Sequence, residues 1–173
     1  MIGFVAGWWL WLAPERAAAL QESSPFPVAA GPRFGVLPGQ VAADIRLPTL
    51  DGGAATLGEH LGHRVLVTFF ASWCDACRAE MPGVQAQAQK HAVHDWVVLG
   101  VDVMETREAA LAFRDEFGLT FPILLDEAGL ATRRYQVTGT PTSLFIDRQG
   151  AIVERRLGYM SEAEIAEIIG RVP

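Results

Sequence analysis

Cysteine is scarce in this 173-residue chain, which contains only two, Cys74 and Cys77. A structural disulfide normally joins cysteines that are well apart, so a pair three positions apart is a poor staple. A structural zinc site needs four ligands, and the chain has neither a second C-x-x-C nor an H-x-x-x-H. No histidine follows Trp96, where a copper-delivery protein would need one. We therefore predict redox chemistry at the cysteine pair, without a metal ion.

Positive charge is also in short supply, because 14 Lys and Arg stand against 20 Asp and Glu and the net charge is -6. A nucleic-acid-binding surface needs a basic face that displaces counterions from phosphates. The composition gives no electrostatic basis for such a face, so we predict no nucleic-acid partner. The length and the 50% hydrophobic content suit one well-packed domain.

The apolar run at the N-terminus is too short to cross a bilayer comfortably. Residues 2–13 are uncharged and hold three of the 5 tryptophans, but as a helix they would rise roughly 18 Å, against a ~30 Å hydrocarbon core. Tryptophans suit a membrane interface and the length suits a signal-peptide core, although no Lys or Arg precedes the run. We expect residues 1–13 to be a signal or anchor segment in contact with a membrane, or the tail of a longer anchor that starts upstream.

Proline marks residues 14–34 as a linker. It removes backbone donors and fixes φ, which favours an extended tether. Ala17–Ala19 resembles a small-residue cleavage site, but Glu15 and Arg16 separate it from the apolar run. We therefore favour a tether over a cleaved signal, followed by one domain at residues 35–173.

Hydrophobic patterning in the domain alternates between strand and helix. The runs 65–70 and 96–102 are β-branched and aromatic, which is typical of strands buried on both faces. Helical patterns follow at 75–92 and from the Thr106 cap to Phe117, before Gly118. Strands separated by helices predict an α/β fold with a central sheet flanked by helices.

Shorter elements complete the predicted domain. A late hairpin makes the sheet mixed, and Ser161-x-x-Glu164 is a capping box that opens a final helix. An N-terminal β-hairpin is expected around Asp51-Gly52-Gly53. The remaining predicted elements are hairpin strands 42–50 with 54–57, a strand at 121–125, a helix at 127–135, and hairpin strands 143–146 with 151–155.

The cysteine pair is placed where a strand gives way to a helix. On a helix, positions 74 and 77 share a face about a turn apart, so their sulfurs can form a reversible disulfide. Helix N-terminal amides stabilise a thiolate, so the pKa of Cys74 should fall below the ordinary ~8.5 and make it the nucleophile. Cys77 would then resolve the mixed disulfide. Asp75 opposes the dipole, which predicts a milder acidification and a reducing bias.

Glu80 follows Cys77 by three positions and shares its helical face. If partial burial raises its pKa, this carboxylate can take the Cys77 proton as a general base. The alternative interpretation is a solvated helix glutamate. Pro82 would kink the helix one turn beyond the pair.

The W-C-x-x-C motif is followed by R-A-E-M-P, and the chain later reads T-G-T-P-T at 138–142 and F-I-D-R-Q-G at 145–150. With these motifs it resembles the membrane-tethered thioredoxin-like proteins of the TlpA/ResA/CcmG type over roughly residues 35–171. The resemblance implies a thioredoxin-like fold with a central strand and helix insertion between about 102 and 126. It also implies that Thr140-Pro141 forms a cis-proline loop facing the cysteines.

Further expectations follow from this resemblance. Trp73, Thr140 and Pro141 would contact an extended substrate peptide, although Trp73 could instead be a half-buried packing aromatic. Thioredoxin carries a buried acid six positions before its first cysteine, and here that position is Thr68, so Glu80 is the nearby candidate for the proton role.

The activity implied is that of an extracytoplasmic thiol:disulfide oxidoreductase that mainly reduces protein disulfides, tethered to the periplasmic side of the inner membrane. It needs no cofactor beyond the redox-active Cys74–Cys77 disulfide. Its substrates would be protein disulfides such as the haem-site cysteines of apocytochrome c, in cytochrome c biogenesis, or oxidised metal-site thiols. A membrane electron donor of the DsbD/CcdA type would recharge it.

Other functions stay open as alternatives. A peroxiredoxin-like peroxidase needs Thr or Ser three positions before its reactive cysteine and Pro further back, where this chain has Ala71 and Val67. A copper-delivery protein or a non-enzymatic binding module is the remaining class, since a fold alone does not fix function.

Overall fold

A computed structural model describes residues 34–91 and 95–173 of the chain. The predicted membrane segment 1–13 and the linker up to residue 33 lie outside the described residues. Within the described residues, no helix combines the length and the apolar character needed to cross a membrane.

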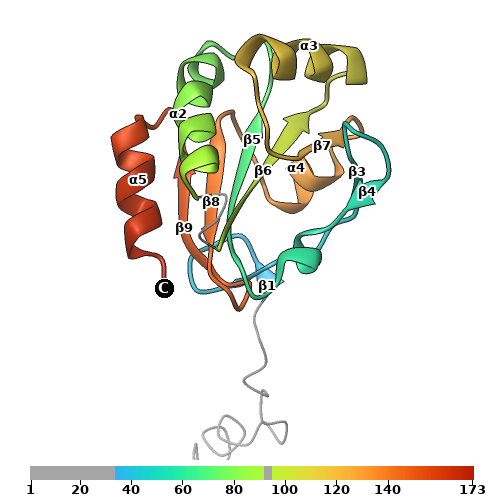
Figure 1. The fold of residues 1–173 in the computed structure, drawn as a ribbon. Coiled ribbons are helices and arrows are strands. Elements are labelled where there is room, and N and C mark those ends of the chain that lie inside the picture. The colour runs from blue at the N-terminus through green and yellow to red at the C-terminus, as the bar shows by residue number, and fades with distance from the viewer. Residues whose placement is uncertain (1–33, 92–94) are drawn as a thin grey trace, which may run out of the picture. The chain divides into compact units, whose positions relative to one another are not determined.

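Five strands form the central sheet in the order β7-β6-β5-β8-β9 (Figure 1). The parallel strands are β5 (Arg64–Phe70), β6 (Trp96–Val103) and β7 (Ile123–Asp126). β8 (Thr142–Ile146) runs antiparallel to β5, and β9 (Ile152–Leu157) antiparallel to β8. The mixed sheet and the late hairpin are therefore as the sequence predicts.

Three helices cover one face of this sheet. They are α2 (Asp75–His91), α3 (Arg107–Phe117) and α5 (Glu162–Arg171), and α2 and α5 lie side by side (Figure 1). Their buried side chains share one core cluster with alternate residues of β5, among them Leu66 and Phe70. Because strand side chains alternate between faces, Thr68 points to this same helical face.

The helix ends show why the sequence places them where it does. Thr106 caps α3 by accepting a hydrogen bond from the Ala109 N–H at 3.4 Å, and Gly118 ends it in the left-handed region at φ 59°. Ser161 and Glu164 form the predicted capping box of α5. α2 continues through Pro82. These boundaries confirm the predicted helices.

β7 and α4 begin later than predicted. β7 begins at Ile123 instead of 121, because Pro122 has no N–H to donate to a ladder. α4 (Leu130–Arg134) begins later than 127, because residues 127 and 128 form a turn and Gly129 adopts φ 67°, which is outside the helical region.

The N-terminal hairpin is shorter than predicted. Its strands β3 (Leu47–Pro48) and β4 (Ala54–Ala55) pair over two residues each. The start of the predicted strand at Ala42 belongs instead to β2 (Val41–Ala42), which pairs in parallel with β1 (Phe34–Gly35). A 3-10 helix, η1 (Leu57–His60), replaces the end of the second predicted strand.

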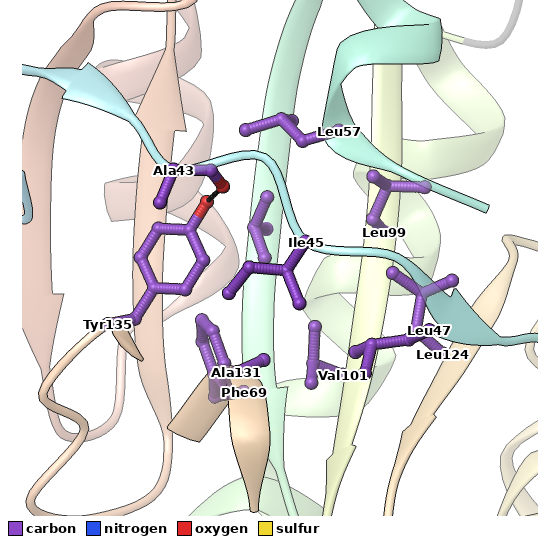
Figure 2. A pocket seen from close by; sticks show the side chains of 11 residues that line it. Ala43, Ile45, Leu47, Leu57, Phe69, Leu99, Val101, Leu124, Ala131 and Tyr135 are labelled. Carbon is purple, nitrogen blue, oxygen red and sulfur yellow. Dashed lines mark hydrogen bonds between the residues drawn. The ribbon is translucent and has the colours of Figure 1, made fainter. Parts of the chain in front are cut away.

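The segment between β2 and β3 crosses the second face of the sheet. Ala43, Ile45 and Leu47 lie over Phe69 and its neighbours, and the Tyr135 hydroxyl donates to the Ala43 carbonyl (Figure 2). The apolar space they enclose is about 20 Å³, room for about one water molecule. This face is packed core, so the chemistry must lie elsewhere.

Candidate active site

The cysteine pair lies at the edge of the sheet where the parallel strands end. β5 ends at Phe70, a short loop follows, and α2 begins at Asp75, directly after Cys74. The carboxyl ends of parallel strands meet at one edge, which is where open α/β sheets place ligand sites. The loops that follow β6 and β7 therefore reach the same region.

Cys74 and Cys77 form a disulfide in the structure, with their Cα atoms 5.2 Å apart. Cys74 is 7% exposed and Cys77 is fully buried. The Cys77 N–H donates to Cys74 Sγ at 3.1 Å. A helix N-terminal amide thus points at the sulfur predicted to carry the negative charge, and the more accessible sulfur is the one predicted to attack first.

The Thr140–Pro141 loop faces this disulfide. Its peptide bond is cis, and the Thr140 carbonyl oxygen lies 3.4 Å from Cys74 Sγ. The Gly158 N–H donates to the Pro141 carbonyl at 2.8 Å. The cis geometry and the position expected from the family resemblance are confirmed. Peptide binding by this loop stays a prediction.

Trp73 is 69% exposed, beside the nucleophile. The alternative of a half-buried packing aromatic is therefore wrong. An exposed indole next to a reactive sulfur is available to a substrate, as the predicted contact role requires.

Glu80 is buried on the inner face of α2, at 1% exposure. Its Oε2 accepts a hydrogen bond from the Met160 N–H at 3.2 Å, while Oε1 has no partner among the described residues. Burial raises the pKa of Glu80 to about 7, against the lowering effects of that hydrogen bond and of the nearby Ser143 hydroxyl. The solvated-glutamate alternative is wrong, and the condition for a general base near neutral pH is met.

Thr68 occupies the position where thioredoxin has its acid. It pairs in register with Ser143 on β8, and the Ser143 hydroxyl donates to Thr68 Oγ1 at 3.1 Å. Both side chains are buried. This neutral pair leaves Glu80 as the buried acid on α2.

Two acids near the site were missed by sequence reasoning. Glu105 accepts from both the N–H and the hydroxyl of Ser72, each at 2.6 Å, and so holds the loop that leads to Cys74. Asp102 is 0% exposed at the end of β6, and neither of its oxygens has a hydrogen-bond partner among the described residues. An acid at the end of the apolar run 96–102 was the available indication that Asp102 is buried.

Burial raises the pKa of Asp102 to about 8, and the nearby carboxylates of Glu105 and Glu127 add to the effect. These three acids belong to the ends of β6 and β7, beside the cysteine loop.

The histidines do not join the site in the part of the chain that is described. His63 pairs with Asp95 at 2.8 Å and is exposed. Among residues 34–91 and 95–173, no group of three or more His, Cys, Asp or Glu side chains is arranged to hold a metal ion. His94 lies outside the described residues.

Comparison with known proteins places this site in a recognisable context. Residues 38–155 match the AhpC/TSA family. The chain is 35% identical over 136 residues to the thioredoxin-like protein YneN of Bacillus subtilis, covering 77% of this chain and 79% of that protein. It is 31% identical over 127 residues to the thiol-disulfide oxidoreductase ResA of Geobacillus kaustophilus, covering 73% of each chain.

Solved structures agree. One structure is described provisionally as the thiol:disulfide interchange protein DsbE of Chlorobium tepidum. It superposes with a TM-score of 0.72 at 28% identity, covering 78% of this chain and 95% of that one. A second structure, from Bacteroides thetaiotaomicron, is described provisionally as a protein disulfide isomerase. It superposes with a TM-score of 0.72 at 33% identity, covering 79% of this chain and 87% of that one. The thioredoxin-like fold is confirmed.

Proposed function

The chain belongs to the AhpC/TSA family and is a thiol-disulfide oxidoreductase of the ResA type, and we propose that it works outside the cytoplasm as a reductant of protein disulfides. The disulfide exchange in this proposal rests on the Cys77 N–H directed at Cys74 Sγ, at 3.1 Å, which marks Cys74 as the attacking residue. That amide favours a thiolate on the more accessible of the two sulfurs.

The reaction begins with both cysteines reduced. The Cys74 thiolate attacks one sulfur of a substrate disulfide, forming a mixed disulfide and releasing the other substrate sulfur as a thiolate. Cys77 then loses its proton and attacks Cys74 Sγ. The second substrate thiol is released, the substrate has gained two electrons, and the Cys74–Cys77 disulfide remains.

Glu80 is the proposed acceptor of the Cys77 proton. It lies one helical turn from Cys77 on the same buried face of α2, and burial brings its pKa to about 7. A carboxylate with that pKa can both accept and return a proton near neutral pH. Thr140 and Pro141 would orient the substrate peptide, and Trp73 would contact it.

The reducing direction is proposed from the charge beside Cys74. Asp75 is exposed in the first turn of α2, adjacent to the sulfur that must carry negative charge. The negative charge of Asp75 makes the Cys74 thiolate less stable, and the thiolate belongs to the reduced form. Because the reduced form is then less stable, the dithiol is a stronger reductant.

Location and partners are proposed from the family resemblance. Residues 1–13 would tether the domain at the outer face of the cytoplasmic membrane. There the enzyme would reduce protein disulfides, such as those of apocytochrome c, and receive electrons from a membrane dithiol donor of the DsbD/CcdA type.

A redox titration of the Cys74–Cys77 couple, run beside a peroxide-consumption assay, tests this function. We expect a potential near that of thioredoxin, about -270 mV, and no peroxide turnover. A potential near about -120 mV would indicate an oxidant instead. Rapid peroxide consumption would favour the peroxidase alternative.

A further inference from the structure

A groove of about 450 Å³ opens beside the nucleophile. We call it the Trp73 groove, and its lining residues are Trp73, Met104, Glu105, Thr106, Ala109 and Glu127. It is formed where the loops after β5, β6 and β7 meet, which explains why it lies next to Cys74. Its volume falls within the range of sites for small ligands or single side chains.

Two of the residues that line the groove are large apolar side chains open to solvent. Trp73 is 69% exposed and Met104 is 59% exposed. Met104 also adopts φ 55°, in the left-handed region that a non-glycine residue seldom occupies. Apolar side chains that stay this exposed beside a reactive sulfur suit a transient contact with a substrate.

Two carboxylates give the groove its negative charge. Glu105 and Glu127 line the groove, and the charges of both raise the pKa of the fully buried Asp102. Neither oxygen of Asp102 has a hydrogen-bond partner among the described residues. Glu105 is held by Ser72, whereas Glu127 is exposed and forms no ion pair in the described part of the chain.

The nearby arginines form no ion pair with the two carboxylates among the described residues. Arg133 approaches Met104 but donates to the Ala128 carbonyl at 2.8 Å. Arg46 and Arg107 line a separate groove, which Glu127 also borders. None of the residues that line the Trp73 groove is basic, so its two carboxylates favour a positive charge from a substrate.

We propose that the Trp73 groove binds a lysine or arginine side chain of the substrate, located next to the cysteine that Cys74 attacks. The aliphatic stem would lie along the Trp73 ring and Met104, with the charged end at Glu127 and Glu105. This inference rests on the thiol exchange proposed above and adds a charge requirement to its substrates.

Three peptides test the subsite. In each peptide a single cysteine forms a mixed disulfide with glutathione. The residues on both sides of that cysteine are Lys in the first peptide, Gln in the second and Glu in the third. The reduced full chain is mixed with each peptide, and the second-order rate constant of glutathione release is measured. Because an ion pair between the substrate lysine and Glu127 would be solvent-exposed, we expect the Lys peptide to react about two- to fivefold faster than the Glu peptide at low salt. At about 0.5 M salt the ratio should approach one.

Glu127→Gln identifies the groove as the cause. Glu127 is exposed, so this variant should fold, and it should lower the Lys-to-Glu ratio toward one, with Glu105 still in the groove. Glu167→Gln on α5 is the matched control and should keep the parent ratio. Equal rates for the three peptides, or a ratio unchanged by Glu127→Gln, overturn the subsite alone. If no peptide reacts, the exchange reaction itself fails, and the subsite with it.

Discussion

The Met160 N–H donates to one oxygen of Glu80, at 3.2 Å, and leaves the other oxygen of that buried carboxyl without a partner among the described residues. One amide hydrogen bond offsets only part of the cost of burying a carboxylate. Burial accordingly raises the pKa of Glu80 to about 7. A group that exchanges its proton at that pH, one turn from Cys77, leads to two separate predictions.

The first concerns the rate of exchange. Glu80→Gln keeps the shape of the side chain but cannot accept a proton. We expect resolution of the mixed disulfide by Cys77 to slow by about 100-fold. The dependence of that step on pH around 7 should disappear. Stopped-flow measurements across this pH range check it, with Glu167→Gln as an exposed helix glutamate for comparison. An unchanged pH profile would exclude Glu80 from the proton transfer.

The second concerns stability. The pKa of Glu80 is raised from 4.5 to about 7 in the folded protein. Between these values the unfolded chain releases the proton and the folded chain keeps it, so the free energy of unfolding falls as pH rises and levels off above about 7. The loss is about 3 kcal/mol, at 1.36 kcal/mol per pKa unit.

Asp102, with its pKa raised to about 8, adds a decline of the same sign. The difference between Glu80→Gln and the parent isolates the Glu80 contribution. We expect the relative stability of the variant to rise from acidic to mildly alkaline pH in urea unfolding experiments. A difference that is constant with pH would mean that Glu80 titrates alike in the folded and unfolded chain.

Local pattern was enough to predict some parts of this protein and not others. Continuous apolar runs and capping residues fix β5, β6 and α3, because burial and helix ends depend on near neighbours in sequence. Helical spacing alone put Glu80 on the face of Cys77. The predicted strands of the N-terminal hairpin are longer than the observed ones, which pair over two residues and carry almost no periodic pattern.

Contacts between distant segments needed the fold. Ser72 and Glu105 meet because β5 and β6 end side by side in a parallel register, which pairs Phe70 with Asp102. Nothing in either local sequence indicates that pairing. The loop at Thr140 reached the site in our expectation only through the family resemblance, and its 3.4 Å approach to Cys74 depends on β8 lying next to β5.

Cys77→Ser should trap the substrate. With Cys74 still able to attack and no second thiol to release the product, a mixed disulfide at Cys74 accumulates. We expect a stable adduct between this variant and a peptide disulfide, detected by mass spectrometry, and none with Cys74→Ser. An adduct formed by Cys74→Ser in place of Cys77→Ser would reverse the assigned roles of the two cysteines.

Ser72→Ala tests whether Glu105 positions the nucleophile. The substitution removes the hydroxyl hydrogen bond to Glu105 at 2.6 Å and leaves the backbone one. Loss of one partly exposed hydrogen bond to a charged group should lower the free energy of unfolding by about 1 to 2 kcal/mol. If that bond also holds the Trp73-Cys74 loop, the second-order rate of attack by Cys74 should fall as well, because a freer loop points the sulfur less often at its target.

Ser161→Ala separates positioning from general destabilisation. Ser161 caps α5 by accepting from the Glu164 N–H at 3.3 Å, and losing such a cap costs a similar amount, about 1 kcal/mol. Ser161 caps α5, whereas the helix that begins after Cys74 is α2. The two variants should therefore lose comparable stability, while only Ser72→Ala attacks disulfides more slowly. Equal slowing in both would mean that the rate follows stability, and that the bond between Glu105 and Ser72 plays no part in orienting Cys74.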